Sequence, residues 1–265
     1  MSHAPSIALS IAGSDPSGGA GIQADLKTFQ RFGVYGEAVV TLLTVQNTRG
    51  VSRIELVEPD LVSDQIAALL DDIPPAAIKT GALGSACIIE AVAAVLAAVR
   101  NLPLVIDPVM LSKNGAKLLD DPGVDALRRH LLPFAYLMTP NLLEAEGLTG
   151  RKVRTIDQMA DAARALADTG ARSVLIKGGH LDGDAVDLLL TNGTIELYPS
   201  PRIPTRHTHG TGCVHSAAIT AGLADGLPLV EAVRRAKQFV SAAIANHPGF
   251  GKGSGPVDFW ARETT

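Results

Sequence analysis

Short apolar runs alternate with longer amphipathic segments along almost the whole chain, and this alternation restricts the fold more than any other property of the sequence. The apolar runs are predicted strands, and the amphipathic segments are predicted helices. Repeated strand–helix units form parallel sheets whose connections are right-handed crossovers. The sequence therefore predicts an α/β protein with a central, mainly parallel sheet flanked by helices.

The bounds of these elements follow from apolar periodicity and from capping residues. We predict strands at 6–12, 38–45, 76–81, 103–107, 135–139 and 173–179. We predict helices at 21–33, 59–73, 85–100, 122–132, 155–168, 211–225 and 229–246, and one more that begins just past Pro140. Residues 185–198 are a predicted small β-hairpin that turns at Asn192 and Gly193, because Asn-Gly favours the tight turn of a hairpin.

The composition agrees with this fold class. The chain has 265 residues, of which 46% are hydrophobic and only 4% are aromatic. Its core must therefore consist mostly of Ala, Val, Ile and Leu, which suits parallel strands covered by helices. Because no repeat, low-complexity tract or linker interrupts the pattern, we expect residues 1–265 to form a single domain.

Charge and cysteine content exclude several classes of partner. The formal net charge is −4 and no run of Lys or Arg occurs, which argues against nucleic-acid binding. The first residues lack the basic region of a signal peptide, and Glu90 interrupts the most apolar segment, so we expect no membrane span. Two cysteines do not make a disulfide framework, which favours a reducing, cytoplasmic location.

Polar or special residues follow nearly every predicted strand. In open parallel sheets, ligands bind outside the carboxyl ends of the strands. Any one of these residues could simply belong to a solvated turn, but the whole set favours a shared ligand site. The set consists of Gly13, Ser14, Asp15, Gln46, Asn47, Lys79, Thr80, Asp107, Thr139, Asn141, Lys177, Gly178 and Gly179.

The segment "HGTGC" at 209–213 has the character of an anion site. Gly210 and Gly212 allow several backbone N–H groups to point at one spot, and the following helix adds positive charge at its N-terminus. The sequence contains neither a Walker A motif nor a G-x-G-x-x-G dinucleotide motif. An ordinary helix start with glycines for close packing is the alternative.

Cys213 strengthens the case for a catalytic site. A thiol in the first turn of a helix is expected to have a lowered pKa and could act as a general base toward a substrate hydroxyl. Cys87 lies in an apolar run and is expected to be a small buried residue. A zinc site formed by His207, His209, Cys213 and His215 is a less favoured alternative, because the helix start would separate these side chains.

Two further patterns point to phosphates. Glu144 follows Asn141 by three residues, so both lie on one face of a helix start and could hold hydrated Mg²⁺. Lys177 ends a strand and precedes two glycines, which suits a cation that approaches phosphate oxygens. A capped helix with a solvated glutamate, and a solvated lysine, are the alternatives.

Seven segments together resemble the ribokinase-like superfamily, and within it the hydroxymethylpyrimidine/phosphomethylpyrimidine kinases of thiamin biosynthesis. They are "IAGSDPSGGAGIQADLKTF" near the start, "VQNTRGV" at 45–51, "VIDPVM" at 105–110, "TPNLLEAEGLTG" at 139–150, "LIKGGH" at 175–180, "THGTGC" at 208–213 and "GPV" at 255–257. The resemblance implies a three-layer fold and ATP-dependent, Mg²⁺-dependent phosphorylation of 4-amino-5-hydroxymethyl-2-methylpyrimidine and of its monophosphate. It also implies a homodimer.

The resemblance further implies roles for individual residues. Asp25 and Gln46 would recognise the pyrimidine, and Gly13, Val109 and Cys213 would line the same pocket. Transfer would be catalysed by Cys213 and Lys177 together with the anion hole of Gly210, Thr211 and Gly212. The ATP site would comprise Asp107, Asn141, Glu144, Lys177, Thr208, Thr211 and Gly212, with Asp107 and Glu144 as the Mg²⁺ ligands.

The chain departs from the family pattern at three positions. His207 stands where we expect Asn, Ala82 stands where we expect a Met over the pyrimidine, and His215 replaces an apolar or aromatic residue. Ala82 therefore predicts a roomier pocket. Two other functions stay open from the sequence: a pyridoxal or pyridoxine kinase of the same superfamily, and a pyrimidine-binding sensor without catalysis.

Overall fold

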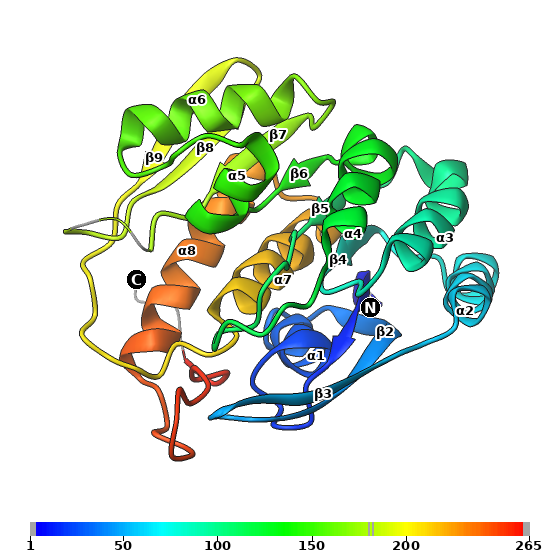
Figure 1. Cartoon of the computed structure of the whole chain (residues 1–265), viewed down its shortest axis with the longest axis horizontal. Helices are drawn as coiled ribbons and strands as arrows, with labels where there is room; N and C mark the ends of the chain where they lie inside the picture. Colours follow the sequence, from blue (N-terminus) through cyan, green and yellow to red (C-terminus); the bar gives the residue numbers. More distant parts are fainter. Residues whose placement is uncertain (1–3, 180, 182, 262–265) are drawn as a thin grey trace.

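A nine-stranded sheet runs through the computed structural model, in the order β3-β2-β1-β4-β5-β6-β7-β8-β9. The structure describes residues 4–179, 181 and 183–261. The central strands β2, β1, β4, β5, β6 and β7 are parallel, whereas β3 at one edge and β8 and β9 at the other are antiparallel to their neighbours. Helices cover both faces of this sheet (Figure 1).

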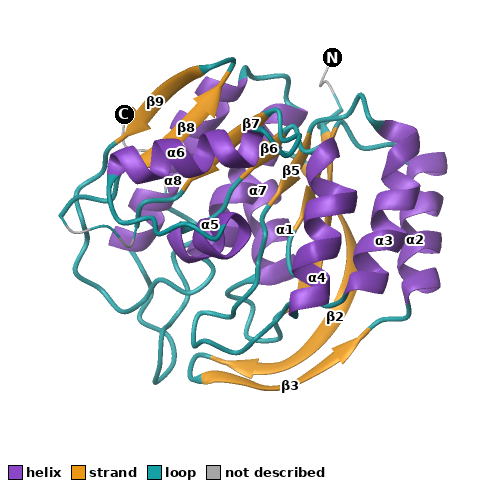
Figure 2. Ribbon diagram, turned by 45° about the horizontal axis from the view of Figure 1, so that its top comes forward, coloured by secondary structure: helices purple, strands orange, loops and turns teal. Residues whose placement is uncertain are grey.

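The strands alternate with helices in the predicted order (Figure 2). The strands are β1 Ile7–Ser14, β2 Tyr35–Asn47, β3 Gly50–Leu56, β4 Ala77–Thr80, β5 Leu104–Ile106, β6 Leu137–Met138, β7 Ser173–Ile176, β8 Asp187–Thr191 and β9 Thr194–Tyr198. The helices are α1 Gly21–Arg31, α2 Pro59–Asp72, α3 Ala86–Leu96, α4 Asp121–Ala126, α5 Leu142–Thr149, α6 Ile156–Ala167, α7 Thr211–Ala224 and α8 Leu229–Ala245.

Side chains from the two faces of the sheet enter two separate cores. Leu9, Ile11 and Ile78 pack with helices α2 to α6, whereas Ala8 and Ala77 pack with α1, α7 and α8. Helix α7 contacts α1, α8 and strands β1, β4 and β5, and every residue from Val214 to Ala224 is buried. Small side chains are needed on both surfaces because α7 lies directly on the sheet. These two layers of helices and the sheet between them form the predicted three-layer architecture.

The predicted hairpin is confirmed at its turn. Asn192 and Gly193 both have positive φ angles, 49° and 75°, as a tight hairpin turn between β8 and β9 requires. Strand β3 was not predicted, because Gly50–Leu56 is largely exposed and lacks an apolar run.

Two local predictions are wrong. The helix predicted at 122–132 ends as an α-helix at Ala126 and continues as a π turn and a 3₁₀ turn to Phe134, where Pro133 cannot donate a backbone hydrogen bond. Cys87 is exposed rather than buried, because α3 turns Ile88, Ile89 and Val92 toward the core instead.

In the described part of the chain, no helix combines the length and the apolar character that crossing a membrane requires.

Glu37 is a buried carboxylate in strand β2. Its side chain is 5% exposed, and both of its carboxylate oxygens lack a hydrogen-bond partner. Burial raises the pKa of Glu37 to about 7. The folded state therefore binds the Glu37 proton more tightly than the unfolded chain does. This contribution to stability is present below about pH 4.5 and is lost as the pH rises through about 7.

We predict that Glu37→Gln reduces the loss of stability between pH 5 and pH 8 by on the order of 1 kcal/mol or more, because the amide does not ionise. Urea unfolding at both pH values measures this difference for the variant and for the wild type. An equal loss of stability in both proteins would show that Glu37 ionises in the folded state as it does in the unfolded chain.

Candidate active site

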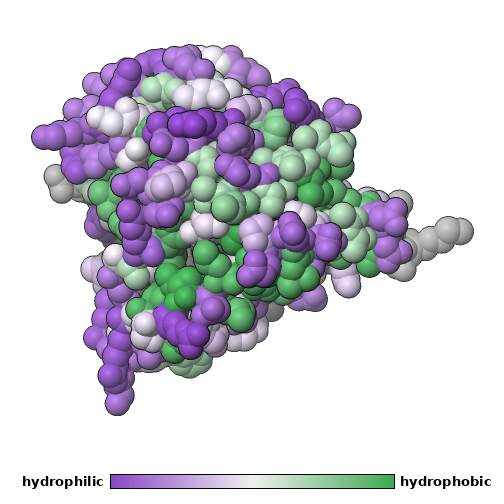
Figure 3. All heavy atoms as spheres, turned by 45° about the vertical axis from the view of Figure 1, so that its right-hand side comes forward, coloured by the Kyte–Doolittle hydropathy of each residue, from purple (hydrophilic) through white to green (hydrophobic). Residues whose placement is uncertain are grey.

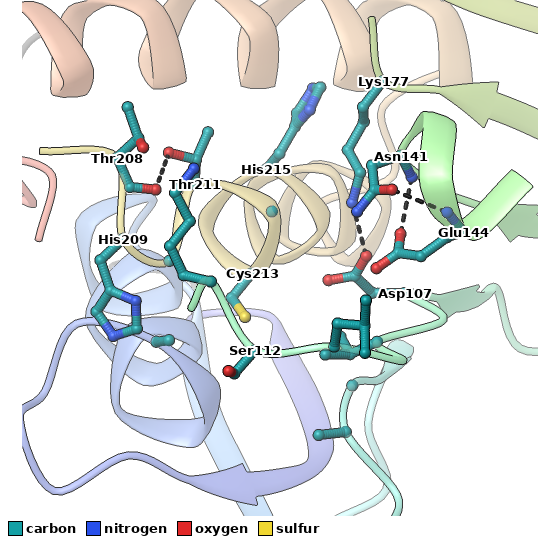
Figure 4. A pocket seen from close by; sticks show the side chains of 18 of the residues that line it. Asp107, Ser112, Asn141, Glu144, Lys177, Thr208, His209, Thr211, Cys213 and His215 are labelled. Atoms are coloured by element: carbon teal, nitrogen blue, oxygen red, sulfur yellow. Dashed lines mark hydrogen bonds and ion pairs between the residues drawn. The ribbon is translucent and has the colours of Figure 1, made fainter. Parts of the chain in front are cut away.

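A pocket of about 1170 Å³ lies at the carboxyl ends of the parallel strands. Residues that are far apart in the sequence line it together, as Figure 4 shows for ten of them. Twelve of the thirteen predicted site residues belong to its lining: Gly13, Gln46, Asp107, Val109, Asn141, Glu144, Lys177, Thr208, Gly210, Thr211, Gly212 and Cys213.

The N-terminus of α7 forms the floor of this pocket. Gly210 precedes the helix with a φ of 77°, and no side chain caps the first turn. A Cβ at Gly210 would lie 1.7 Å from the carbonyl oxygen of Gly19, so only glycine fits this close approach to the loop before α1. The N–H groups at the start of α7 therefore face the pocket with the positive end of the helix dipole. This geometry suits an anion.

The threonines of the segment shape the approach to α7. The Thr211 hydroxyl donates to the carbonyl oxygen of Thr208 at 2.8 Å, and the Thr211 N–H points to the same oxygen at 3.3 Å. These bonds close a tight turn just before the helix. Thr208 and Thr211 lie together at the pocket wall in Figure 4.

Cys213 lies in the first turn of α7, with its sulfur directed toward the pocket (Figure 4). The N–H of Gly21, at the start of α1, also faces the sulfur. The predicted lowering of its pKa is wrong for this structure: burial raises the pKa of the thiol to about 12, Lys79 lowers it in part, and Asp25 and Asp107 raise it further. Two nearby carboxylates and the loss of solvent outweigh the helix start.

Asp107 and Lys177 form an ion pair at one side of the pocket (Figure 4). Lys177 Nζ donates to Asp107 Oδ1 at 2.8 Å, and the hydroxyls of Thr139 and Ser216 donate to the two carboxylate oxygens at 3.2 and 3.3 Å. Burial would raise the pKa of Asp107, but Lys177 and Lys79 hold it below its ordinary value. Asp107 is therefore ionised. A Cβ at Gly212 would lie 3.2 Å from Lys177 Nζ, so this ammonium borders the anion site.

Asn141 and Glu144 form a reciprocal capping box at the start of α5. The Asn141 side chain accepts from Glu144 N–H at 2.9 Å, and the Glu144 carboxylate accepts from Asn141 N–H at 2.7 Å. This arrangement is the capped helix that the sequence left open as an alternative, although its glutamate is buried and lines the pocket rather than being solvated.

Glu144 also bears on a metal site. Burial raises the pKa of Glu144 to about 7, Lys177 lowers it, and the negative charge of Asp107 raises it further. Two carboxylates thus reach one pocket wall with one ammonium between them. Mg²⁺ is commonly held by one or two carboxylates together with substrate phosphates and water, so Asp107 and Glu144 fit such an ion. In residues 4–179, 181 and 183–261, no three His, Cys, Asp or Glu side chains form a ready-made metal cluster.

Asp25 does not line the pocket, and the prediction that its carboxylate contacts a pyrimidine is not supported. Its side chain is fully buried and accepts from Lys79 Nζ at 2.7 Å and from the Ser10 hydroxyl at 2.6 Å. Both bonds go to the same carboxylate oxygen, Oδ2. The second oxygen is buried without a partner.

Asp15 was expected only as one of the polar residues after the strands and His209 only in the zinc alternative, yet they form a buried pair beside Gln46. The Asp15 carboxylate lies 2.7 Å from His209 Nε2 and accepts from Ser17 and Ala20 N–H at 2.9 Å each. Burial would raise the pKa of Asp15, but the His209 and Ser17 hydrogen bonds lower it. The Gln46 amide nitrogen lies 3.3 Å from the same ring nitrogen. The position of Asp15 after the first strand was a signal for the site, but nothing in the sequence indicated that Asp15 pairs with His209.

Part of the pocket lining is apolar. Val240 and Ile244 of α8 belong to this part, together with Ile203 and Pro204. His215, from the second turn of α7, also lines the pocket, and its Nδ1 is 3.8 Å from Asp187. Burial lowers the pKa of His215 to about 4, so the ring is neutral.

The structure also shows the surroundings of His207 and Ala82, the other two residues that depart from the family pattern. His207 stacks on His247 with ring centroids 4.4 Å apart. Ala82 lines the pocket near Gly13, where its small side chain leaves room. His180 of the motif "LIKGGH" lies outside the described residues.

Taken together, these contacts place an anion cradle, an ammonium, two carboxylates and a thiol around one pocket of an α/β fold. The cradle and Lys177 can hold a phosphate, and the thiol lies where a substrate hydroxyl could meet it. The fold and the site define a phosphotransferase that acts on small molecules.

Comparisons with known proteins agree with this class. The family model described as phosphomethylpyrimidine kinase matches residues 15–258. The hydroxymethylpyrimidine/phosphomethylpyrimidine kinase of Rhizobium meliloti is 48% identical over 262 residues, which cover 97% of each chain. The thiamine biosynthesis bifunctional protein ThiED of Geobacter sulfurreducens is 51% identical over 94% of this chain, which spans about half (51%) of that relative's length. The chain belongs to the phosphomethylpyrimidine kinase family.

Solved structures share the fold. The ADP complex of Bacillus subtilis pyridoxal kinase superimposes with a TM-score of 0.90 at 40% identity and covers 97% of this chain and 98% of its own. Phosphomethylpyrimidine kinase from Clostridium difficile gives a TM-score of 0.81 at 43% identity and covers 90% of this chain and 99% of its own. The predicted ribokinase-like kinase fold is thereby confirmed.

Proposed function

We propose that this kinase transfers the γ-phosphoryl group of ATP to 4-amino-5-hydroxymethyl-2-methylpyrimidine and then phosphorylates the resulting monophosphate. The position of Cys213 carries the proposal. Its sulfur is directed toward a pocket that Gln46 and Val109 also line, and Lys177 Nζ lies beside Gly212, the residue before the cysteine. A hydroxymethyl group and a phosphoryl group can therefore meet at one point.

Different residues bind the substrate, accept its proton and stabilise the transferring group. Gln46 offers both a donor and an acceptor to the edge of an aminopyrimidine, and Val109 packs against the ring. The substrate oxygen attacks the γ-phosphorus, the bond from that phosphorus to ADP breaks, and the hydroxyl proton passes to the thiolate form of Cys213. Lys177 and the N–H groups from Gly210 to Cys213 stabilise the charge on the transferring group.

Asp107 and Glu144 would hold Mg²⁺, which neutralises phosphate charge when it is bound. Asn141 positions Glu144 through the capping box, and Thr208 and Thr211 border the phosphates. The apolar lining that Val240 and Ile244 provide suits the adenine base. ATP as donor is supported by the kinase family itself and by ADP in the related B. subtilis structure.

Pyridoxal is the second candidate substrate. It also presents a hydroxymethyl group on a ring, and the related structure with the higher TM-score is a pyridoxal kinase. Ala82 leaves space in the pocket for a different ring substituent.

A comparison of kcat/KM for the two alcohols with ATP and Mg²⁺ tests the assignment. We expect the hydroxymethylpyrimidine to be preferred by at least about tenfold, and we expect chromatography of the products to resolve both mono- and diphosphate. A preference for pyridoxal would replace the proposed substrate. Binding of the pyrimidine without ADP formation would instead indicate a sensor.

Cys213→Ala is predicted to lower kcat by roughly 10²–10⁴-fold, the usual loss for a positioned base. Because burial raises the pKa of Cys213 to about 12 and that of Glu144 only to about 7, kcat of the wild type should keep rising with pH between 8 and 9, above the range in which Glu144 ionises, and this part of the rise should be absent in the variant. Steady-state kinetics across that range measure both effects. A loss of less than about tenfold would assign the transfer to the cradle, Lys177 and the metal, and would leave the thiol as a bystander.

We also propose that the chain works as one cytoplasmic kinase domain and forms a homodimer. Its nine strands belong to one sheet, and both cysteines are free. Leu43 and Val45, on the face of β2 turned away from the pocket, are 53% and 57% exposed, and apolar surface gathers in the lower half of the face shown in Figure 3.

We predict that a second copy of the chain covers this face of β2. Light scattering should give twice the chain mass for the wild type and a smaller mass for Leu43→Glu/Val45→Glu at the same concentration. A monomeric wild type would contradict the prediction.

A further inference from the structure

Lys79 is a buried charge to which the proposed reaction gives no task. Its ammonium in the central strand β4 is 0% exposed and pairs with Asp25 Oδ2 at 2.7 Å. Burial would lower the pKa of Lys79, but Asp25 raises it above its ordinary value, so the ammonium keeps its proton. A buried ion pair of this kind is seldom worth more to stability than packed apolar side chains would be. Its presence calls for another reason.

The ion pair lies directly beneath the pocket. Ser10 is the register partner of Lys79 on the neighbouring strand β1, so both side chains leave the same face of the sheet. That face is covered by α1, which carries Asp25, and by α7, which carries Cys213. A Cβ at Gly81 would lie 3.4 Å from Lys79 Nζ, and Gly81 itself lines the pocket. Gly81, which has no side chain, therefore lies between the Lys79 ammonium and the pocket.

Cys213 is surrounded by charges from several elements. Lys79 from β4 is the charge that most favours its thiolate, whereas Asp25 from α1 and Asp107 after β5 disfavour it. Lys177 after β7 also interacts with the sulfur, and the N–H of Gly21 points to it. Lys177 is engaged by Asp107 and borders the phosphate site. Lys177 is thus already paired with Asp107, whereas Lys79 is paired with Asp25 on the face of the sheet that α7 covers, and its charge favours the thiolate.

We propose that Lys79 is a positioning residue of the phosphoryl transfer: held by Asp25 and Ser10 beneath the pocket floor, its ammonium stabilises the thiolate of Cys213. The inference rests on the proposed function, in which this thiolate receives the hydroxyl proton. Asp25 then serves the site indirectly. Its carboxylate keeps Lys79 charged and in place, which explains why it is buried rather than exposed in the pocket.

The test compares Lys79→Met, which keeps the length of the side chain without its charge, with Lys79→Met/Asp25→Asn, which makes the whole pair neutral. All proteins carry Cys87→Ser, because Cys87 is exposed and is the other of the two cysteines. Iodoacetamide alkylation of Cys213 at pH 9 reports its thiolate without requiring kinase activity. Lys152→Met, at an exposed position, is the matched control for loss of one positive charge.

We expect Lys79→Met to slow the alkylation of Cys213 by roughly tenfold or more, because a neighbouring opposite charge changes a pKa by about one to three units. The double variant should be slower than the wild type but no slower than Lys79→Met, because Asp25 no longer opposes the thiolate. Lys152→Met should match the wild type. If Lys79 only supports packing, its loss opens the site to solvent and alkylation becomes faster. Faster or unchanged alkylation would overturn the proposal.

Kinetics of the same variants complete the test. Lys79→Met should lower kcat by about the factor seen in alkylation, with the KM for the pyrimidine changed by less than about threefold. Circular dichroism and Tm establish that each variant is folded, and the double variant provides the readout if the single one is not. Slower alkylation with an unchanged kcat would overturn the role in transfer. Failure of the proposed function is seen separately, as a wild-type protein that does not phosphorylate the pyrimidine.

Discussion

The contact between Gly210 and the loop before α1 is the constraint on which the site depends. The carbonyl oxygen of Gly19 lies where a side chain at Gly210 would have to be, so the two segments meet backbone to backbone. This approach turns the free N–H groups of α7 toward the pocket and brings the start of α1 close to the same point. The start of α7 thereby offers the positive end of its helix dipole to the anion site, and the N–H of Gly21 at the start of α1 faces the nearby thiol.

A second consequence of this contact is that the charged side chains are arranged around the cradle instead of within it. Lys177 and Asp107 pair at one side, Glu144 is held by the start of α5, and Lys79 lies below. Each carboxylate already accepts hydrogen bonds from the protein. The side chains are therefore fixed before any ligand arrives, and binding need not order them.

The sequence was sufficient for the order of most strands and helices, for the hairpin turn, and for a set of site residues that nearly all line the pocket. These features depend on local periodicity, on Asn192-Gly193, and on the rule that ligands lie at the carboxyl ends of parallel strands. Strand β3 could not be predicted in the same way, because a ribbon outside the main core has no need of an apolar run.

The errors at the site arise from burial. Cys213 was expected to ionise readily because a helix begins beside it, but desolvation and two carboxylates act more strongly on its pKa. The sequence motif suggested that Asp25 binds the substrate. In the structure, its carboxylate instead accepts a hydrogen bond from Lys79 and is buried below the pocket floor. Neither the depth of a side chain nor the sum of the charges around it can be deduced from motif spacing.

Helix α7 also has a consequence for the biosynthesis of the chain. Strand β1 leaves the ribosome well before helix α7, yet Ala8 on one face of β1 is covered by this helix, which begins at Thr211. Roughly 200 residues, or about 10–40 s of translation, separate the two. During that interval the nascent sheet has an uncovered apolar side, and a chaperone that shields it would influence how much enzyme a cell obtains from each message.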